Sequence, residues 1–169
     1  MTQLSPEQWR ILNYLYQGKL HTVRPKMVGV RISQKVTDTD LLDLIARDLI
    51  GAVLVDDDNP ISNVPRPLLK YVRLKLTAAG LRTVLDDPGN QIRYTLGQHT
   101  GPITFVKLVD LNPEVGYDEV AEQMHHGLIT ASCEDLDEFA VIWLVLARSA
   151  IASQFLITLT AKGREYLPC

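Results

Sequence analysis

The sequence predicts an α+β protein made of two small domains, over residues 1–88 and 90–169, each a helical cluster with a β-hairpin. Three observations lead to this prediction. Helical and strand-like periodicities alternate in the first half, a short motif recurs near the end of the chain, and charge is divided unevenly between the halves. With 169 residues, of which 46% are hydrophobic and 22% charged, the chain has the composition of a globular protein.

The first expected element is a helix that begins at Pro6. Ser5 can cap this helix, Pro6 suits the first helical position, and Gln8 completes a capping box with Ser5. Apolar residues then recur at helical spacing, namely Trp9, Ile11, Leu12, Leu15 and Tyr16. Gly18 is expected to end the helix, because glycine accepts the left-handed conformation common at that position.

A second helix is expected over residues 39–50, with Asp38 as its cap and Gly51 at its end. Its apolar stripe is formed by Leu41, Leu42, Ile45 and Leu49. The segment between the two helices has a weak pattern, since Pro25 and Gly29 interrupt it. A short helix over 27–36 is one interpretation of that segment.

A hairpin and a closing helix complete the first domain. Residues 52–55 are typical of a strand, and the Asp- and Pro-rich residues 56–67 predict a long turn. Residues 69–76 alternate as a half-buried second strand, with a break in register near Val72. Thr77 is expected to cap a helix over 77–86 that ends before Pro88-Gly89, and residues 87–90 are expected to join the domains.

The recurring motif is an L-T-x-x-G step. It stands at Leu76–Gly80 and again at Leu159–Gly163, 83 residues later, and a helix over 117–126 precedes the second copy. Residues 139–147 and 154–159 are the expected strands of a second hairpin. A helix over 136–149 is the alternative, because this apolar run has no clean period of two.

This order of elements, with the L-T-x-x-G step after the second strand, resembles the winged-helix superfamily and is loosely similar to multidrug-resistance-type repressors. In that family a three-helix cluster packs against a two-stranded hairpin, the wing, and a closing helix often follows. The resemblance implies tandem winged-helix domains, each a small helical cluster with a β-hairpin wing. It also implies a non-enzymatic, DNA-associated protein.

Charge distinguishes the two halves. Twelve Lys and Arg against ten Asp and Glu give residues 1–89 a net +2, whereas five against ten give residues 90–169 a net −5. Because cations neutralise phosphates, the first half is predicted to bind double-stranded DNA. The predicted nucleic-acid-binding residues are Arg24, Lys26, Arg31, Lys35, Arg66, Lys70 and Arg73.

One feature opposes base reading by the first half. The helix over 39–50 would enter the major groove in DNA-reading members of the family, yet it carries several aspartates. Carboxylates are repelled by phosphates and find a base-edge partner chiefly in the cytosine amino group. Either the reading helix lies at 27–36, or this domain does not read bases.

The acidic second half is predicted to mediate dimerisation or contact with a protein partner. Its apolar run 139–147 is either core or a partner surface, and core is the preferred interpretation, because large exposed apolar patches are rare in monomers. If the run is exposed, Phe139, Ile142 and Trp143 are the predicted partner-binding residues.

No pattern predicts a catalytic residue, a metal site or a cofactor. His125 and His126 are adjacent, so on a helix they point about 100° apart and do not easily share an ion. Cys133 lies seven residues after His126 and has no second thiol nearby in the sequence, so it completes no metal-binding spacing. The N-terminal segment lacks a signal-peptide pattern, and the longest apolar run falls short of the roughly 20 residues of a membrane span. A cytoplasmic protein without membrane contact is therefore expected.

These observations support a small winged-helix transcriptional regulator that holds DNA through phosphate contacts from its N-terminal half. The alternative is a tandem winged-helix adaptor that binds proteins and has no affinity for DNA. The aspartates of the helix over 39–50 favour the second hypothesis, and the cations of the first half favour the first.

Overall fold

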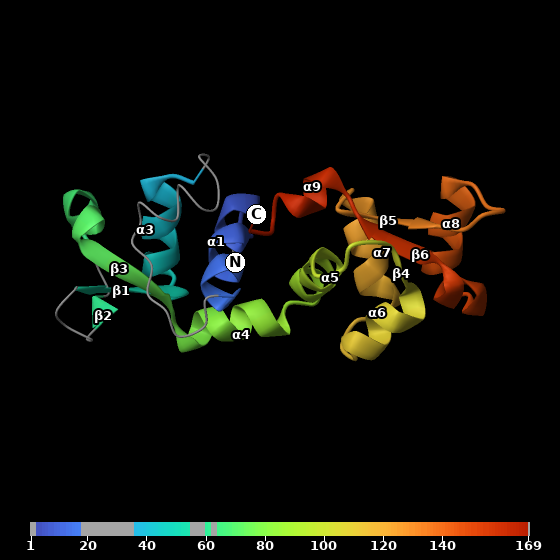
Figure 1. The fold of residues 1–169 in the computed structure, drawn as a ribbon, viewed down its shortest axis with the longest axis horizontal. Coiled ribbons are helices and arrows are strands. Elements are labelled where there is room, and N and C mark those ends of the chain that lie inside the picture. Colours follow the sequence, from blue (N-terminus) through green and yellow to red (C-terminus); the bar gives the residue numbers. More distant parts are fainter. Residues whose placement is uncertain (1–2, 18–35, 55–59, 62–63, 169) are drawn as a thin grey trace. The chain divides into compact units, whose positions relative to one another are not determined.

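The computed structural model describes residues 3–17, 36–54, 60–61 and 64–168, which form helices and two small antiparallel sheets (Figure 1). The protein therefore belongs to the α+β class, as its sequence predicts. It divides into two compact units, unit 1 with residues 1–86 and 165–169 and unit 2 with residues 87–164. The sequence assigns everything after residue 90 to the second domain, whereas the chain groups with unit 1 again from Glu165. There the backbone carbonyl of Tyr166 accepts a 3.1 Å hydrogen bond from the buried Asn13 side chain.

In the described part of unit 1, the helices α1, α3 and α4 pack against the sheet formed by β1, β2 and β3 (Figure 1). Its elements are α1 (Pro6–Gln17), α3 (Asp38–Ala46), β1 (Ile50–Leu54), β2 (Pro60–Ile61), the 3₁₀ helix η1 (Arg66–Tyr71), β3 (Val72–Leu76) and α4 (Ala78–Asp86). The strand order is β2-β1-β3, and β1 pairs with β3 from Ile50 opposite Leu76 to Leu54 opposite Val72. The core consists of buried apolar residues from every layer, chiefly Trp9, Ile11, Leu12, Leu15, Leu41, Leu44, Ile50, Leu69, Leu74 and Val84.

Unit 2 has its own helices, sheet and core. Its elements are α5 (Pro88–Gly97), β4 (Ile103–Thr104), α6 (Phe105–Leu111), α7 (Tyr117–His125), β5 (Ile129–Ser132), α8 (Glu138–Leu146), the 3₁₀ helix η2 (Ala150–Gln154), β6 (Leu156–Leu159) and α9 (Ala161–Arg164). The strand order is β4-β6-β5. Burial alternates along β5 and β6, so the paired residues Ile129 and Leu159, and Ala131 and Ile157, face the core together.

The capping box expected at the first helix is confirmed. The Gln8 backbone N–H donates to Ser5 Oγ (3.2 Å), and the Ser5 backbone N–H donates to Gln8 Oε1 (3.1 Å). The α1 helix extends to Gln17. Gly18, the segment 19–35 and the short helix considered over 27–36 lie outside the described residues.

The second helix is shorter than its apolar pattern predicts. It begins at Asp38 with Thr37, not Asp38, as its cap, and it ends at Ala46. Asp48 then adopts a left-handed conformation with φ 58°, and β1 begins at Ile50. The apolar pattern predicts a longer helix because Leu49 follows Ile45 at the helical spacing of four residues, although Leu49 lies in the turn after α3.

The segment 69–76 is not one strand. Residues 66–71 form η1, and only Val72–Leu76 form β3. Leu69 on η1 and Val72, the first residue of β3, are both buried, whereas Tyr71 between them is exposed. The break in register near Val72 that the sequence shows is the junction between these two elements.

The strand predicted over 139–147 was wrong, and the helical alternative is confirmed by α8. The strand predicted over 154–159 begins at Leu156, after η2, and it pairs with β5 and with β4.

The segment 87–90, which the sequence predicts as a linker, contains the start of the helix α5. Asp87 caps α5 by accepting a 2.7 Å hydrogen bond from the Asn90 N–H, and Pro88 takes the first turn.

The L-T-x-x-G step forms the same joint in both units. The Thr77 N–H donates to the carbonyl of Leu49 (3.2 Å), its hydroxyl donates to the carbonyl of Asp48, and Oγ1 accepts from the Gly80 N–H (3.0 Å). In unit 1, these bonds join the end of β3 to the turn that follows α3. In unit 2, the corresponding bonds join the end of β6 to the turn that follows α7.

The joint of unit 2 repeats these bonds. The Thr160 N–H donates to Leu128 O (3.1 Å), its hydroxyl donates to Gly127 O (2.7 Å), and Oγ1 accepts from the Gly163 N–H (3.0 Å). The residues whose carbonyls accept the hydroxyl bonds also correspond, because Asp48 (φ 58°) and Gly127 (φ 70°) are both left-handed. The recurring motif in the sequence therefore marks a recurring local structure.

Glycine in this motif is required by space. A Cβ on Gly80 would overlap the carbonyl oxygen of Leu49, and a Cβ on Gly163 would overlap that of Leu128. Both neighbours are backbone atoms, which cannot rotate away as the end of a long side chain can. The glycines thus allow the closing helices α4 and α9 to approach the preceding turns.

We expect Gly80→Ala and Gly163→Ala each to lower the free energy of unfolding by about 2 kcal/mol or more, because the new methyl group overpacks against backbone. Alanine would otherwise favour a helical position by roughly 1 kcal/mol. Urea unfolding followed by circular dichroism measures the change. Gly101→Ala is the control, because a Cβ there meets nothing within 4 Å. Equal stability of all three variants would contradict the described joint.

Candidate nucleic-acid and protein-binding surfaces

The structure describes three of the seven predicted nucleic-acid-binding residues. Arg66 and Lys70 lie on η1 with exposed side chains, and Arg73 lies half-buried on β3. Arg24, Lys26, Arg31 and Lys35 lie outside the described residues. The three described cations belong to one continuous stretch of unit 1 between the segment 55–63 and α4.

These cations differ in their surroundings. Arg66 Nη2 donates a 3.0 Å hydrogen bond to Thr39 Oγ1, at the start of α3. The Lys70 ammonium lies 5.1 Å from the centre of the exposed Tyr71 ring, a cation–π contact. Among the described residues, no carboxylate forms an ion pair with Arg66, Lys70 or Arg73. Their charge is therefore not cancelled by a described acidic neighbour.

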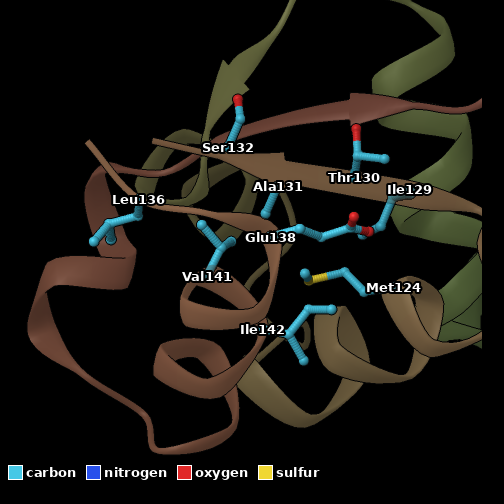
Figure 2. A pocket seen from close by; sticks show the side chains of 9 residues that line it. All are labelled: Met124, Ile129, Thr130, Ala131, Ser132, Leu136, Glu138, Val141 and Ile142. Atoms are coloured by element: carbon cyan, nitrogen blue, oxygen red, sulfur yellow. The ribbon is translucent and has the colours of Figure 1, made fainter. Parts of the chain in front are cut away.

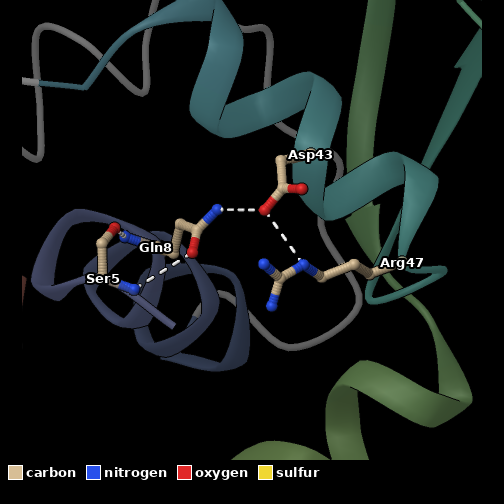
Figure 3. A network of polar contacts seen from close by, with 4 residues as sticks. All are labelled: Ser5, Gln8, Asp43 and Arg47. Carbon is tan, nitrogen blue, oxygen red and sulfur yellow. Dashed lines mark hydrogen bonds and ion pairs between the residues drawn. The ribbon is translucent and has the colours of Figure 1, made fainter. Parts of the chain in front are cut away.

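The aspartates of α3 are partly occupied by contacts within unit 1 (Figure 3). Asp43 Oδ2 accepts a 2.6 Å hydrogen bond from the buried Gln8 side chain and lies 3.0 Å from Arg47 Nε. Asp40 Oδ2 accepts hydrogen bonds from the backbone and hydroxyl of Thr37. These two carboxylates fix α3 to α1 and cap its start.

This arrangement suits phosphate contact better than base reading. Arginine and lysine contact phosphates without regard to sequence. A helix that reads bases needs polar side chains that are free to contact base edges. On α3, Asp43 and Arg47 form an ion pair with each other instead. The Asp38 side chain, at the first position of α3, is exposed and adds negative charge there.

In unit 2, a buried polar contact joins the helices α5 and α7. Arg93 on α5 donates a 2.6 Å hydrogen bond to Gln123 on α7, and both side chains are buried. A Cβ on Gly89 would overlap the Gln123 amide, so glycine leaves room for this contact. The outer side of α7 carries Asp118, whose carboxylate pairs with Arg148 at 2.7 Å, both exposed.

The outward face of α8 is apolar. Four large side chains on it are exposed, with Phe139 at 79%, Ile142 at 36%, Trp143 at 60% and Leu146 at 63% of their full accessibility. We call these four residues the α8 stripe. Val141 and Val145, on the opposite side of the helix, are buried in unit 2. The preferred interpretation of residues 139–147 as core is therefore wrong for the stripe and right for the two valines.

Leu146 was missed as a candidate residue. The signal was present in the spacing, because residues 139, 142, 143 and 146 follow the i, i+3, i+4, i+7 pattern of one helix face. Under the strand interpretation the same residues alternate between two faces, and the stripe is not visible. Only the helical interpretation therefore places Leu146 on the same face as Phe139, Ile142 and Trp143.

A pocket of about 270 Å³ lies on the inner side of α8, between this helix, α7 and β5. Met124 and Glu138 extend into it from α7 and α8, and Ile142 of the stripe lines it as well (Figure 2). The remaining lining is mostly apolar, from residues such as Ile129 and Val141. The pocket is continuous with the exposed stripe through Ile142.

The titratable residues of unit 2 form no described metal centre. The rings of His125 and His126 lie edge to face with centroids 5.5 Å apart, and His126 Nε2 lies 3.8 Å from Glu122. Over the described ranges, no group of three or more His, Cys, Asp or Glu side chains is placed to hold a metal ion.

Among the described residues, no helix is both long and apolar enough to cross a membrane.

Comparison with protein-family models, curated proteins and solved structures found no match to this chain. Function is therefore inferred from the surfaces themselves, namely the cations of η1 and β3 and the α8 stripe. These two surfaces belong to different units.

The orientation of α8 predicts different effects for neighbouring substitutions. Val141→Ala should lower the free energy of unfolding by about 1–3 kcal/mol, because it empties space in the core. Phe139→Ala should change it by less than about 0.5 kcal/mol, because this side chain touches mainly solvent. Thermal unfolding at low protein concentration measures both changes. Equal losses would mean that α8 does not present Phe139 outward.

Proposed function

We propose that the protein is a non-enzymatic, DNA-associated protein with two winged-helix units, and that unit 1 holds double-stranded DNA through phosphate contacts. The element order supports the family assignment. In unit 2, three helices (α5, α6 and α7) precede the β5 and β6 pair, and a closing helix follows. Unit 1 has the same closing joint at Thr77 as unit 2 at Thr160.

The observation that carries the DNA proposal is the cationic stretch from Arg66 to Arg73. Two of its cations are exposed, and none forms an ion pair with a described carboxylate. Phosphate contacts release counterions, so affinity from such residues falls steeply as salt rises. Double-stranded DNA is the proposed partner because its two strands present closely spaced phosphates.

The proposed binding is weak in sequence preference. Asp43 is held by Gln8 and Arg47, and Asp38 adds negative charge at the start of α3. A helix with this surface disfavours close approach to the floor of the major groove. A role as a transcriptional regulator then requires that unit 2, or a partner of unit 2, contributes to the selection of a site.

The second candidate is an adaptor that binds proteins and has no affinity for DNA. The acidity of unit 2 and the exposed α8 stripe favour it, because apolar patches rimmed by charge mark protein interfaces. The two hypotheses differ in one measurement, the retention of mixed duplex fragments at low salt.

We expect the triple change of Arg66, Lys70 and Arg73 to Ala to weaken retention of duplex DNA. The slope of log affinity against log salt should fall by roughly 2 to 3, because each lost phosphate contact removes about 0.9. Fluorescence anisotropy over a salt series measures both. The matched control changes Lys107, Lys162 and Arg164 of unit 2 to Ala, which removes the same three positive charges and should have a much smaller effect. If the wild-type chain shows no salt-sensitive retention, the adaptor hypothesis replaces this one.

A further inference from the structure

We propose that the α8 stripe is the contact surface for a second copy of this chain, with the two α8 helices antiparallel about a twofold axis. The inference goes beyond DNA association and rests on different residues. Its basis is the exposure of Phe139, Ile142, Trp143 and Leu146 on one helix face.

The apolar side chains of the α8 stripe are exposed in a single copy of the chain, so a partner is expected to bury them. An α-helix that is apolar on all sides is normally buried on all sides. The inner side of α8 is buried through Val141 and Val145, whereas its outer side carries two exposed aromatic rings and two exposed aliphatic side chains. Each of these aromatic side chains can bury roughly 150–250 Å². The exposed parts of the four residues therefore amount to apolar surface on the order of 500 Å², which is comparable to the largest apolar patch of a typical monomer, and such patches are often functional.

The area of the stripe suits association with itself. In a twofold dimer the same patch is used on both copies, so the buried area doubles. The total is then on the order of 1,000 Å², the lower limit for a specific interface. Positions i, i+3, i+4 and i+7 form a narrow seam, which is the shape that two packed helices share.

Charge at the ends of α8 selects the antiparallel direction. The exposed Asp137 caps the start of the helix, whereas Arg148 follows its last turn. In an antiparallel pair the acidic start of one helix faces the basic end of the other. Arg148 pairs with Asp118 within the chain, but both side chains are mostly exposed, and an exposed pair of this kind contributes little. Arg148 can therefore turn to the second copy at small cost.

The first experiment measures the mass of the full chain by sedimentation over a range of protein concentrations. The wild-type chain should form a dimer as concentration rises. Trp143→Ser should weaken dimerisation by about 30-fold or more, since a central aromatic residue dominates an interface of this kind. Leu111→Ser is the control, because Leu111 on α6 is 51% exposed and lies outside the stripe. Circular dichroism verifies that both variants are folded.

Two results would overturn the proposal. The wild-type chain could remain a monomer at every concentration, which would leave the stripe to a different, basic partner. Alternatively, Leu111→Ser could weaken the dimer as much as Trp143→Ser, which would place the interface elsewhere. Neither result depends on DNA, so failure of the dimer and failure of DNA retention are distinguished.

A second experiment tests the antiparallel arrangement by disulfide formation in a chain with Cys133→Ser and Cys169→Ser. Ile142→Cys lies near the proposed axis, so two copies of this variant should cross-link with each other. Phe139→Cys alone and Leu146→Cys alone should not, whereas a mixture of the two should cross-link. Efficient self-linking of Phe139→Cys together with failure of the mixture would indicate a parallel pair and contradict the proposal.

Discussion

The two units depend on one constraint, the enclosure of a backbone carbonyl by a threonine and a glycine. The carbonyl oxygens of Leu49 and Leu128 each accept a hydrogen bond from the threonine that follows the last strand of their unit. The glycine three residues later leaves no side chain between the closing helix and that carbonyl. Helix, sheet and closing helix are thus joined at one point in each unit, and the remaining core packs around it.

The units share this frame and differ in what they present to solvent. Unit 1 has a 3₁₀ helix with Arg66 and Lys70 just before its last strand. In unit 2, the α8 helix stands between β5 and η2 and carries the exposed stripe. Polar contacts between helices, namely Gln8 with the half-buried Asp43 in unit 1 and Arg93 with Gln123 in unit 2, hold each frame and are not offered to a partner. We therefore place the proposed functions in the segments between the paired strands.

Local sequence signals predicted several elements well. The capping box at Ser5 and Gln8 and the cap at Thr77 each depend on side chains within three residues of the helix start, so no distant contact is needed. Asp87 and Pro88 carried the same kind of signal for α5, but it was interpreted as a linker. The strand expected over 139–147 failed because its residues are apolar at nearly every position, and such a run fits either element.

The sequence by itself determined the α+β class, the recurrence of the L-T-x-x-G step and the opposite charge of the two halves. These features depend only on residue types and on short spacings along the chain. Only the tertiary structure decided which side of α8 is buried and where α3 stops. The physical reason is that both outcomes depend on neighbours distant in sequence: Val141 and Val145 are buried because unit 2 packs against them, and Ile50 leaves the helix pattern because β3 pairs with it.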